Sequence, residues 1–439
     1  MRLSTSLRLN AQKGLVTPYD PTLTLSLQFA TRQAYVSDFG PLPTFTNATT
    51  TARTYVGSDG LLKTAGLNVP RIEFDPVTRQ CLGLLIEEQR QNLCIHSENL
   101  SAANWGKSNV AVTSDTSVAP DGLSTADVVA ETAVSGFHTV STPSMTPTSG
   151  TAYALSVFLK KGPGSTAPDW IILGTSNQFP TFVVAFNVLT GQFGNVLGGA
   201  SATYKAVQYA NGWWRVSIVI TASGSSATSP LTIYFSNNTN TVSAPSYLGN
   251  TTSNVLIWGA QVEAGAFASS YIPTTTTSLV RSADVCSITG AAFTGFYNQT
   301  EGTMVLKMDK AYPVPASISQ LNYLTIGDGT VNNYIHFAQR GSGTTGEVLR
   351  VETLGSSQCF ISGSSTVTAG VAFGMASRYK LNDFALSVSG ATVAKDNTGS
   401  IPVVSQLDFV TYNSSNHIRS LQYFNAIKTD AQLQALSTP

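Results

Sequence analysis

Charged side chains are scarce in this sequence. Lys and Arg number 24 and Asp and Glu number 24, so charged residues are 11% of the 439 positions, against roughly 25% in an average soluble domain. The formal net charge is zero. Nucleic-acid binding needs a concentration of basic side chains to neutralise phosphates, so we predict no nucleic-acid partner. Because a neutral chain also lacks the repulsion that keeps proteins apart, the composition favours a component of an assembly.

Long apolar runs and paired cysteines are also missing. No stretch approaches the 18 consecutive apolar residues of a membrane-spanning helix, which predicts no membrane insertion. The segment "MRLSTSLRLNAQKGL" has no apolar core of a secretory signal. The four cysteines, Cys81, Cys94, Cys286 and Cys359, are far apart and lack zinc-ligand spacing. We therefore expect reduced, mostly buried thiols in a protein synthesised in a cytoplasm.

Signatures of catalysis are absent as well. The sequence has no HExxH motif, no GxSxG elbow and no EF-hand loop. "SAANWGKS" places Ser101 where a phosphate-binding loop needs its first glycine. No carboxylate pair is singled out for glycoside hydrolysis. We predict a protein that is not an enzyme, with no cofactor and no catalytic residues. The four histidines lie in separate segments, and the sequence leaves open whether any of them binds a metal.

What the sequence does contain is a long series of short alternating runs, broken by Gly, Pro, Asn and Ser. "YALSVFLKKG" and "NVLIWGAQVEAG" are examples, and the pattern is typical of β-sandwiches. We predict an all-β chain with an extended N-terminal arm and connector at 1–91 and two antiparallel jelly-roll sandwiches at 92–280 and 281–439. One short helix is expected at the C-terminus, where Thr429 and Gln432 have the spacing of a capping box.

Tryptophan is confined to the first predicted sandwich. Trp rings bind sugars through their apolar faces, so we consider four of them as glycan-binding candidates: Trp105, Trp170, Trp213 and Trp258. For each of these side chains, packing in the core is the competing interpretation.

Charge is concentrated in one segment, "RIEFDPVTRQCLGLLIEEQRQNL". Pro70 and Pro76 favour an extended backbone here, and the apolar middle favours a buried strand. Arginines paired with the acidic residues would fix the arm to the first sandwich, since such pairs set register. The predicted structural connector consists of Arg71, Glu73, Asp75, Glu87, Glu88 and Arg90.

The same segment carries a family resemblance. "VPRIEFDPVTRQCLGLLIEEQRQNLCIHSENLSAANW" resembles the signature of a family of bacteriophage structural proteins. "TYVGSDGLLKTAG", "YALSVFLKKG", "NGWWRVSIVITA" and "IWGAQVEAGAFASSYIPTTTTSLVRSADV" agree with that family in order and spacing. In this family these parts are similar to carbohydrate-binding modules. The second half, with "SRYKLNDFALSVSGATV" and "IRSLQYFNAIKTDAQLQALS", resembles laminin-G or concanavalin-like sandwiches.

The resemblance implies a non-enzymatic virion protein made in a host bacterium and displayed on the particle surface. We expect a tail-fibre or adsorption component that contacts other virion proteins and host surface glycans. A homo-oligomer is expected, and the resemblance implies a trimer. Two alternatives stay open, a capsid decoration or head-fibre protein and a polysaccharide-degrading tailspike.

Overall fold

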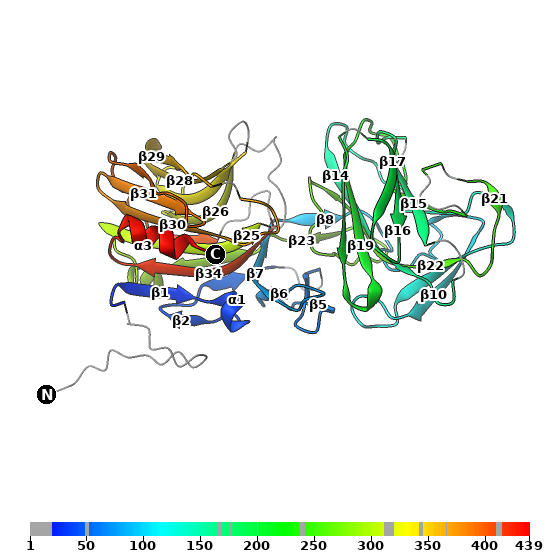
Figure 1. The fold of residues 1–439 in the computed structure, drawn as a ribbon, viewed down its shortest axis with the longest axis horizontal. Helices are drawn as coiled ribbons and strands as arrows, with labels where there is room; N and C mark the ends of the chain where they lie inside the picture. The colour runs from blue at the N-terminus through cyan, green and yellow to red at the C-terminus, as the bar shows by residue number, and fades with distance from the viewer. Residues whose placement is uncertain are drawn as a thin grey trace. The chain divides into compact units, whose positions relative to one another are not determined.

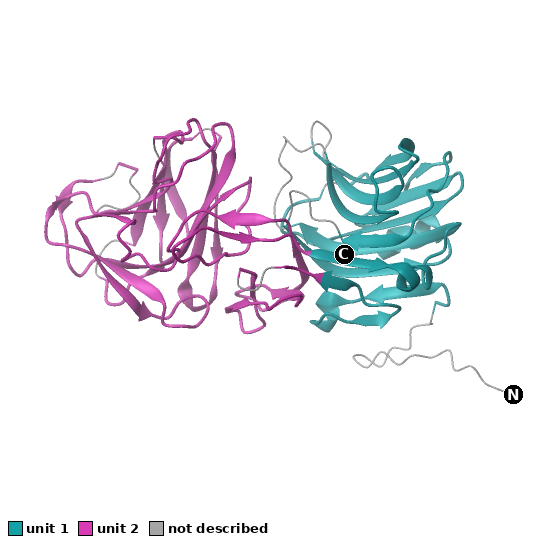
Figure 2. Ribbon diagram, turned by 180° about the vertical axis from the view of Figure 1, so that it is seen from behind, with its two compact units in different colours: residues 1–45, 285–439 teal, residues 46–284 magenta. Residues whose placement is uncertain are grey.

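The computed structural model describes residues 20–48, 52–165, 169–175, 177–199, 201–237, 242–243, 245–310, 320–341, 346–365, 367–409 and 415–439. Almost every described element is a strand, and the chain divides into two compact units (Figure 1). Unit 1 comprises residues 1–45 and 285–439, and unit 2 comprises residues 46–284 (Figure 2). The all-β fold class predicted from the alternating runs is confirmed.

Unit 1 is built from two antiparallel sheets. The first has the order β2 (Ser37–Phe39), β1 (Leu23–Leu27), β34 (Ser415–Phe424), β25 (Glu301–Lys310), β30 (Phe373–Lys380), β31 (Asp383–Val388) and β32 (Ala394–Asp396). The second has the order β29 (Ser356–Ser362), β28 (Gly346–Thr353), β27 (Tyr334–Arg340), β26 (Gln320–Gly327), β33 (Gln406–Phe409), β24 (Val285–Thr289) and β3 (Thr44–Thr46). The central strands β25, β27 and β30 are buried at nearly every position, whereas the edge strand β29 alternates between buried and exposed residues.

The N-terminal segment is part of unit 1 rather than a free arm. Leu25 and Leu27 of β1 lie opposite Tyr423 and Leu421 of β34, and both leucines are fully buried. A helical turn, α1 (Phe29–Arg32), follows and buries Phe29. The prediction of one arm over 1–91 is corrected, because residues 20–45 join the C-terminal sandwich and residues 46–91 join unit 2. The first 19 residues of the predicted arm lie outside the described residues.

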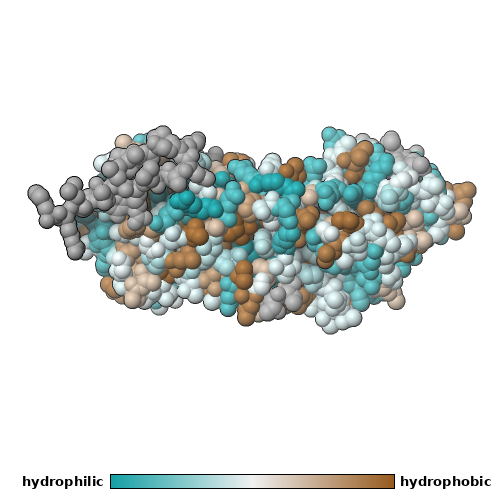
Figure 3. All heavy atoms as spheres, turned by 90° about the horizontal axis from the view of Figure 1, so that it is seen from below, coloured by the Kyte–Doolittle hydropathy of each residue, from teal (hydrophilic) through white to brown (hydrophobic). Residues whose placement is uncertain are grey.

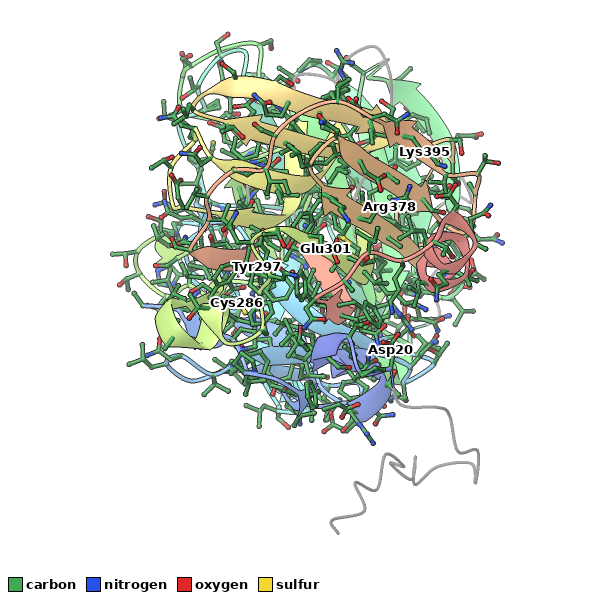
Figure 4. All side chains as sticks on the ribbon, turned by 90° about the vertical axis from the view of Figure 1, so that its left-hand side faces the viewer. Asp20, Cys286, Tyr297, Glu301, Arg378 and Lys395 are labelled. Carbon is green, nitrogen blue, oxygen red and sulfur yellow. The ribbon has the colours of Figure 1, made fainter. Side chains whose placement is uncertain are left out.

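The predicted C-terminal helix is present as α3 (Asp430–Ser437). Thr429 accepts a hydrogen bond from the Gln432 backbone, and the Gln432 side chain accepts one from the Thr429 backbone, which completes the capping box. Asp430 then pairs with Arg378 and Lys395 of the first sheet; these two sheet residues are labelled in Figure 4. Leu433 is fully buried against β25 and β30, so the helix covers the outer face of the first sheet. The other helix of unit 1, α2 (Gly290–Thr294), follows β24.

Unit 2 contains a jelly-roll sandwich. One sheet has the order β10 (Val110–Ser117), β11 (Ala126–Glu131), β22 (Asn254–Ala264), β14 (Ala152–Lys161), β19 (Trp214–Thr221) and β18 (Thr203–Gln208). The facing sheet has the order β17 (Phe193–Gly198), β16 (Phe182–Asn187), β15 (Trp170–Thr175), β20 (Thr232–Phe235), β13 (Thr139–Ser141) and β9 (Gly106–Ser108). The main apolar cluster of unit 2 lies between them, with side chains such as Leu155, Leu173, Phe186 and Ile218.

The rest of unit 2 lies outside the two jelly-roll sheets. It consists of the strand pairs β4 (Thr54–Val56) with β5 (Leu62–Thr64), β6 (Arg71–Phe74) with β7 (Cys81–Glu87), β8 (Arg90–Asn92) with β23 (Leu279–Arg281), and β12 (Ser135–Gly136) with β21 (Tyr247–Leu248), and of one 3₁₀ turn at Ala210–Gly212. The β4–β5 pair is a covering layer on the outer face of the first sheet, since Val56 and Leu62 share an apolar cluster with Phe158, Trp213 and Trp258 of the jelly roll. The central strands β14 and β22 are therefore buried on both faces.

The assignment of β1 to the unit 1 core is testable. Leu27→Ala should destabilise unit 1 by about 2–5 kcal/mol, because the buried side chain leaves a cavity. All five Trp lie in unit 2, so tryptophan fluorescence reports on unit 2 alone. We expect an earlier transition in far-UV circular dichroism with the tryptophan transition unmoved.

Leu42→Ala is the matched control, because Leu42 lies in the same segment and is 43% exposed. Its effect should stay within about 0.5 kcal/mol. Equal stability of the two variants would contradict the placement of β1 in the core.

Candidate functional site

The predicted glycan-binding tryptophans fall into two groups. Trp213 and Trp258 are 0% and 2% exposed in the cluster between the jelly roll and its covering layer, and Trp105 is 3% exposed in the main cluster. Their indole N–H groups are satisfied inside the protein: Trp213 donates to the Val118 carbonyl, Trp258 to the Thr125 hydroxyl and Trp105 to the His96 carbonyl. For these three the ligand-binding interpretation is corrected, since no ring face is free to receive a sugar. Trp170 alone of the four is partly exposed.

Trp170 begins β15 and lies on the outward face of its sheet. Ile171 and Leu173 belong to the main cluster, so the intervening positions 170, 172 and 174 point the other way. On the neighbouring strand Tyr234 lies directly opposite Ile172 and is also partly exposed. A methyl group at Gly174 would come within 3.2 Å of the Tyr234 ring, so the ring lies over this glycine. The glycine thus leaves room for an aromatic ring lying along the sheet surface.

Hydroxyl groups continue this surface across the next strands. Thr139 of β13 lies opposite Tyr234, and Ser141 lies opposite Thr232. The Ser141 and Thr232 hydroxyls are hydrogen-bonded at 2.9 Å. We call this surface the Trp170 face, made of the partly exposed Trp170, Tyr234, Thr232, Ser141 and Thr139, with Ile172 buried among them. Two aromatic side chains and three hydroxyls on one rigid sheet combine stacking and hydrogen-bonding groups, which is the chemistry that recognises a sugar.

The predicted connector contains a buried ionic cluster. Arg71 donates to the Glu87 carboxylate at 2.7 Å and to the Asp284 carboxylate at 2.5 Å, and all three side chains are at most 1% exposed. Two further guanidinium groups join them, since Arg281 contacts Glu87 at 3.0 Å and Arg53 contacts Asp284 at 3.3 Å. We call Arg53, Arg71, Glu87, Arg281 and Asp284 the ionic cluster.

The electrostatics of the cluster keep its carboxylates ionised. Burial alone raises the pKa of Glu87, but the guanidinium groups of Arg281 and Arg71 outweigh it and hold that pKa well below its usual value. Burial likewise lowers the pKa of Arg71, and Asp284 and Glu87 overcome this effect and raise it. The backbone N–H and hydroxyl of Ser270 also donate to Glu87. Buried charges that are paired and hydrogen-bonded in this way fix one arrangement of the chain.

The other predicted connector residues have separate local partners. Glu88 pairs with Arg90 at 2.5 Å, and Arg90 also donates to the Ala264 carbonyl and lies 4.3 Å from the centre of the Phe267 ring. Glu73 accepts a hydrogen bond from the Val56 backbone. Asp75 accepts from the backbone of Val77 and Thr78 in the turn that follows it. Arg71 and Glu87 are thus the only predicted members that the described structure brings into the ionic cluster.

Sequence reasoning missed Arg53, Arg281 and Asp284. Asp284 is 197 residues from Glu87, whose backbone N–H it accepts, so no local spacing connects them. The one available signal was that Arg281 and Asp284 are charged residues in a segment, "SLVRSADV", with few others. The cluster joins β6, β7 and the residue before β4 to β23 and the residues after it.

None of the helices within the described ranges is long and apolar enough to cross a bilayer. Among the residues that the structure describes, no three His, Cys, Asp or Glu side chains come together as a metal-binding group. All four cysteines are buried and none forms a disulfide. On the face shown in Figure 3, apolar residues are scattered among polar ones.

Comparison with known proteins gives distant structural similarity only. No family model and no curated protein matches the chain. The carbohydrate-binding module (CBM40) of Ruminococcus gnavus IT-sialidase, bound to alpha2,3 sialyllactose, is similar with a TM-score of 0.26 and 16% identity over 32% of this chain and 84% of that one. The T. cruzi calreticulin globular domain is similar with a TM-score of 0.24 and 8% identity over 35% and 76%. The NanB sialidase of Streptococcus pneumoniae gives 0.28 and 14% over 34% and 26%. Similarity this weak carries no conclusion about function.

The ionic cluster generates a prediction about stability. Glu87→Gln leaves three buried guanidinium groups short of a carboxylate and should destabilise unit 2 by roughly 3–5 kcal/mol at neutral pH. Because the pKa of Glu87 is lower in the folded chain, its contribution is present above its ordinary pKa of 4.5 and is lost as the pH falls. The difference from wild type, measured by tryptophan fluorescence in denaturant, should therefore shrink on acidification.

Asp59→Asn is the control for charge removal in the same unit. Asp59 pairs with Lys63 on the surface at 2.6 Å, and such pairs contribute at most about 1 kcal/mol. A loss in Glu87→Gln no larger than in Asp59→Asn would contradict a structural role for the cluster.

Proposed function

We propose that this chain is a non-enzymatic structural protein of a bacteriophage virion, an adsorption or tail-fibre component that binds host glycans on the Trp170 face. The observation that carries the glycan-binding part is the pairing of Trp170 and Tyr234 with the hydroxyls of Thr139, Ser141 and Thr232 on one outward sheet face. The apolar ring faces would receive the C–H face of a sugar, and the hydroxyls would exchange hydrogen bonds with its hydroxyls.

The virion part of the proposal is supported by composition and resemblance. A charge-poor, neutral chain of 439 residues suits a protein that packs against others. The phage-like segments from "TYVGSDGLLKTAG" to "SLVRSADV" lie in unit 2 and contain Arg71, Glu87, Arg281 and Asp284. These segments form β4 to β8 and β23 together with the jelly-roll strands β14, β19 and β22.

The non-enzymatic part is supported by the chemistry of the same face. Its side chains are aromatic, aliphatic and hydroxyl groups, with no pair of carboxylates such as glycoside hydrolysis requires. The neighbouring Asp169 pairs with Lys161 at 2.6 Å. The face is suited to holding a ligand rather than to transferring protons.

The glycan-binding role is tested by Trp170→Ala and Tyr234→Ala in the full chain. Each variant should weaken binding to host surface polysaccharide by about tenfold or more, since roughly 1.4 kcal/mol of lost contact suffices. The cooperative unfolding of unit 2 should persist, whereas Trp258→Ala should lower its stability by about 3–5 kcal/mol. Surface plasmon resonance on immobilised polysaccharide and tryptophan fluorescence measure the two effects.

Leu123→Ala is the control, because Leu123 is 61% exposed in unit 2 away from the Trp170 face. Unchanged binding in Trp170→Ala and Tyr234→Ala, or release of oligosaccharide from the polysaccharide, would reject the proposal. Immunogold labelling of particles separates a tail component from the alternative of a capsid decoration or head-fibre protein.

A further inference from the structure

A second polar surface lies on the outward face of the second sheet of unit 1. Leu324, Ile335, Leu349 and Leu407 are buried in the core, so the residues that alternate with them point outward. The registers place six of these outward residues opposite one another across six adjacent strands: Ser287, Asp408, Thr325, His336, Arg350 and Phe360. We call this line the His336 row. At about 4.8 Å per strand it extends over roughly 24 Å.

The centre of the row is held in place by hydrogen bonds. The Thr325 hydroxyl lies 2.6 Å from Nδ1 of His336, and the Tyr334 ring packs against the imidazole with a centroid distance of 3.7 Å. Arg350 donates to Gln320 at 3.1 Å and to the Glu352 carboxylate. These fixed side chains form a pre-arranged surface, so little conformational entropy would be lost when a ligand binds.

Two polar atoms of the row have no hydrogen bond to another described residue. Nδ1 of His336 is bonded to Thr325, but no described group bonds Nε2. Asp408 accepts from Gln406 through Oδ2, and its Oδ1 accepts no bond from the described protein. The two residues lie on either side of Thr325 in the row. Neither atom is among the fully buried polar atoms, so both are available to the hydroxyl groups of a ligand.

The charges of this surface balance locally. Arg350 is paired with Glu352, and Arg340 lies 5.3 Å from the centre of the Phe360 ring, while Asp408 supplies the other carboxylate. Burial and the nearby Arg350 lower the pKa of His336 to about 3, so its imidazole is neutral at physiological pH. Such a surface offers no excess positive charge for an acidic ligand. It offers donors and acceptors together, with Phe360, 41% exposed, as an apolar platform at the end of the row.

We propose that the His336 row is a second binding site, specific for a neutral saccharide with adjacent hydroxyl groups. Nε2 of His336, the Arg350–Glu352 pair and the Asp408 carboxylate bond the hydroxyls, and the Phe360 ring packs on the apolar face of a terminal sugar. The site is independent of the Trp170 face. Two sites in one chain raise the overall affinity for a repetitive polysaccharide without any further contact.

The test uses the full chain and an array of neutral oligosaccharides built from glucose, galactose, mannose and N-acetylglucosamine, with sialylated and uronic-acid oligosaccharides on the same array. Phe360→Ala and Asp408→Asn should each weaken binding of the selected neutral saccharide by about tenfold or more. Leu354→Ala is the matched control, because Leu354 is 82% exposed in the β28–β29 turn outside the row, and it should bind as the wild type.

Nuclear magnetic resonance of ¹⁵N-labelled histidine supplies a direct readout. The chain has four histidines, and the neutral saccharide should shift the Nε2 signal of His336 in wild type and in Trp170→Ala alike. A shift that disappears in Trp170→Ala would assign the binding to the other face and overturn this proposal without affecting the first. Binding of acidic oligosaccharides only, binding unchanged in Phe360→Ala and Asp408→Asn, or no binding on the array would also overturn it.

The burial of His336 makes a separate prediction about the pH at which its imidazole titrates. With its pKa lowered to about 3, the imidazole should stay neutral on titration from pH 8 to about pH 4, whereas an unperturbed histidine titrates near 6.5. Because the unfolded chain then binds the extra proton, the stabilisation from neutral His336 is present above about pH 6.5 and declines as the pH falls. A His336 signal that titrates near pH 6.5 would contradict the desolvated site.

Discussion

Unit 2 depends on the neutralisation of three buried guanidinium groups by two carboxylates. Arg71 lies between Glu87 and Asp284, while Arg281 contacts Glu87 and Arg53 contacts Asp284. Arg53, Arg71 and Glu87 come from the first part of unit 2 in sequence, and Arg281 and Asp284 come from its end, so the cluster joins the two ends of the unit. Replacement by apolar residues could be as stable, but loss of one partner leaves a buried charge uncompensated. The cluster therefore ties β6 and β7 to the segment that contains β23.

In each unit, one sheet is covered on its outer face, and the outer face of the other sheet is left exposed for binding. In unit 2 the covering layer buries Trp213 and Trp258 against the first sheet, and the facing sheet keeps Trp170 and Tyr234 partly exposed. In unit 1 helix α3 covers the first sheet, and the second sheet carries the His336 row. Each sandwich thus has one sheet covered on its outer side and one sheet whose outer face presents aromatic and hydrogen-bonding groups.

Local patterns in the sequence predict local structure well. The Thr429 and Gln432 spacing predicts the cap of α3, and the alternating runs predict the strands, because both depend on residues close in sequence. The partners of Arg71 and the position of β1 could not be predicted in this way. Asp284 and β34 are brought to them by the fold, across more than 200 residues.

The binding faces show the same limit. An alternating pattern identifies two faces of a strand but not which face is covered, so Trp213 and Trp170 are equivalent in sequence and differ in the structure. Nothing in the sequence singles out His336 among four histidines that lie in separate segments. The signal was the alternation of Tyr334 with His336 in "NYIHFAQR" and of Arg350 with Glu352 in "EVLRVET", which places polar pairs on one face. Only the register between the strands shows that these pairs are adjacent.

The central claim is that saccharides bind on the outer sheet faces, and a crystal structure of the full chain with a bound host oligosaccharide tests it most directly. The account predicts sugar rings lying on Trp170 and Tyr234, with hydroxyls bonded to Thr139, Ser141 or Thr232. Oligosaccharide bound only at loops away from that face, with the rings of Trp170 and Tyr234 uncontacted, would contradict it.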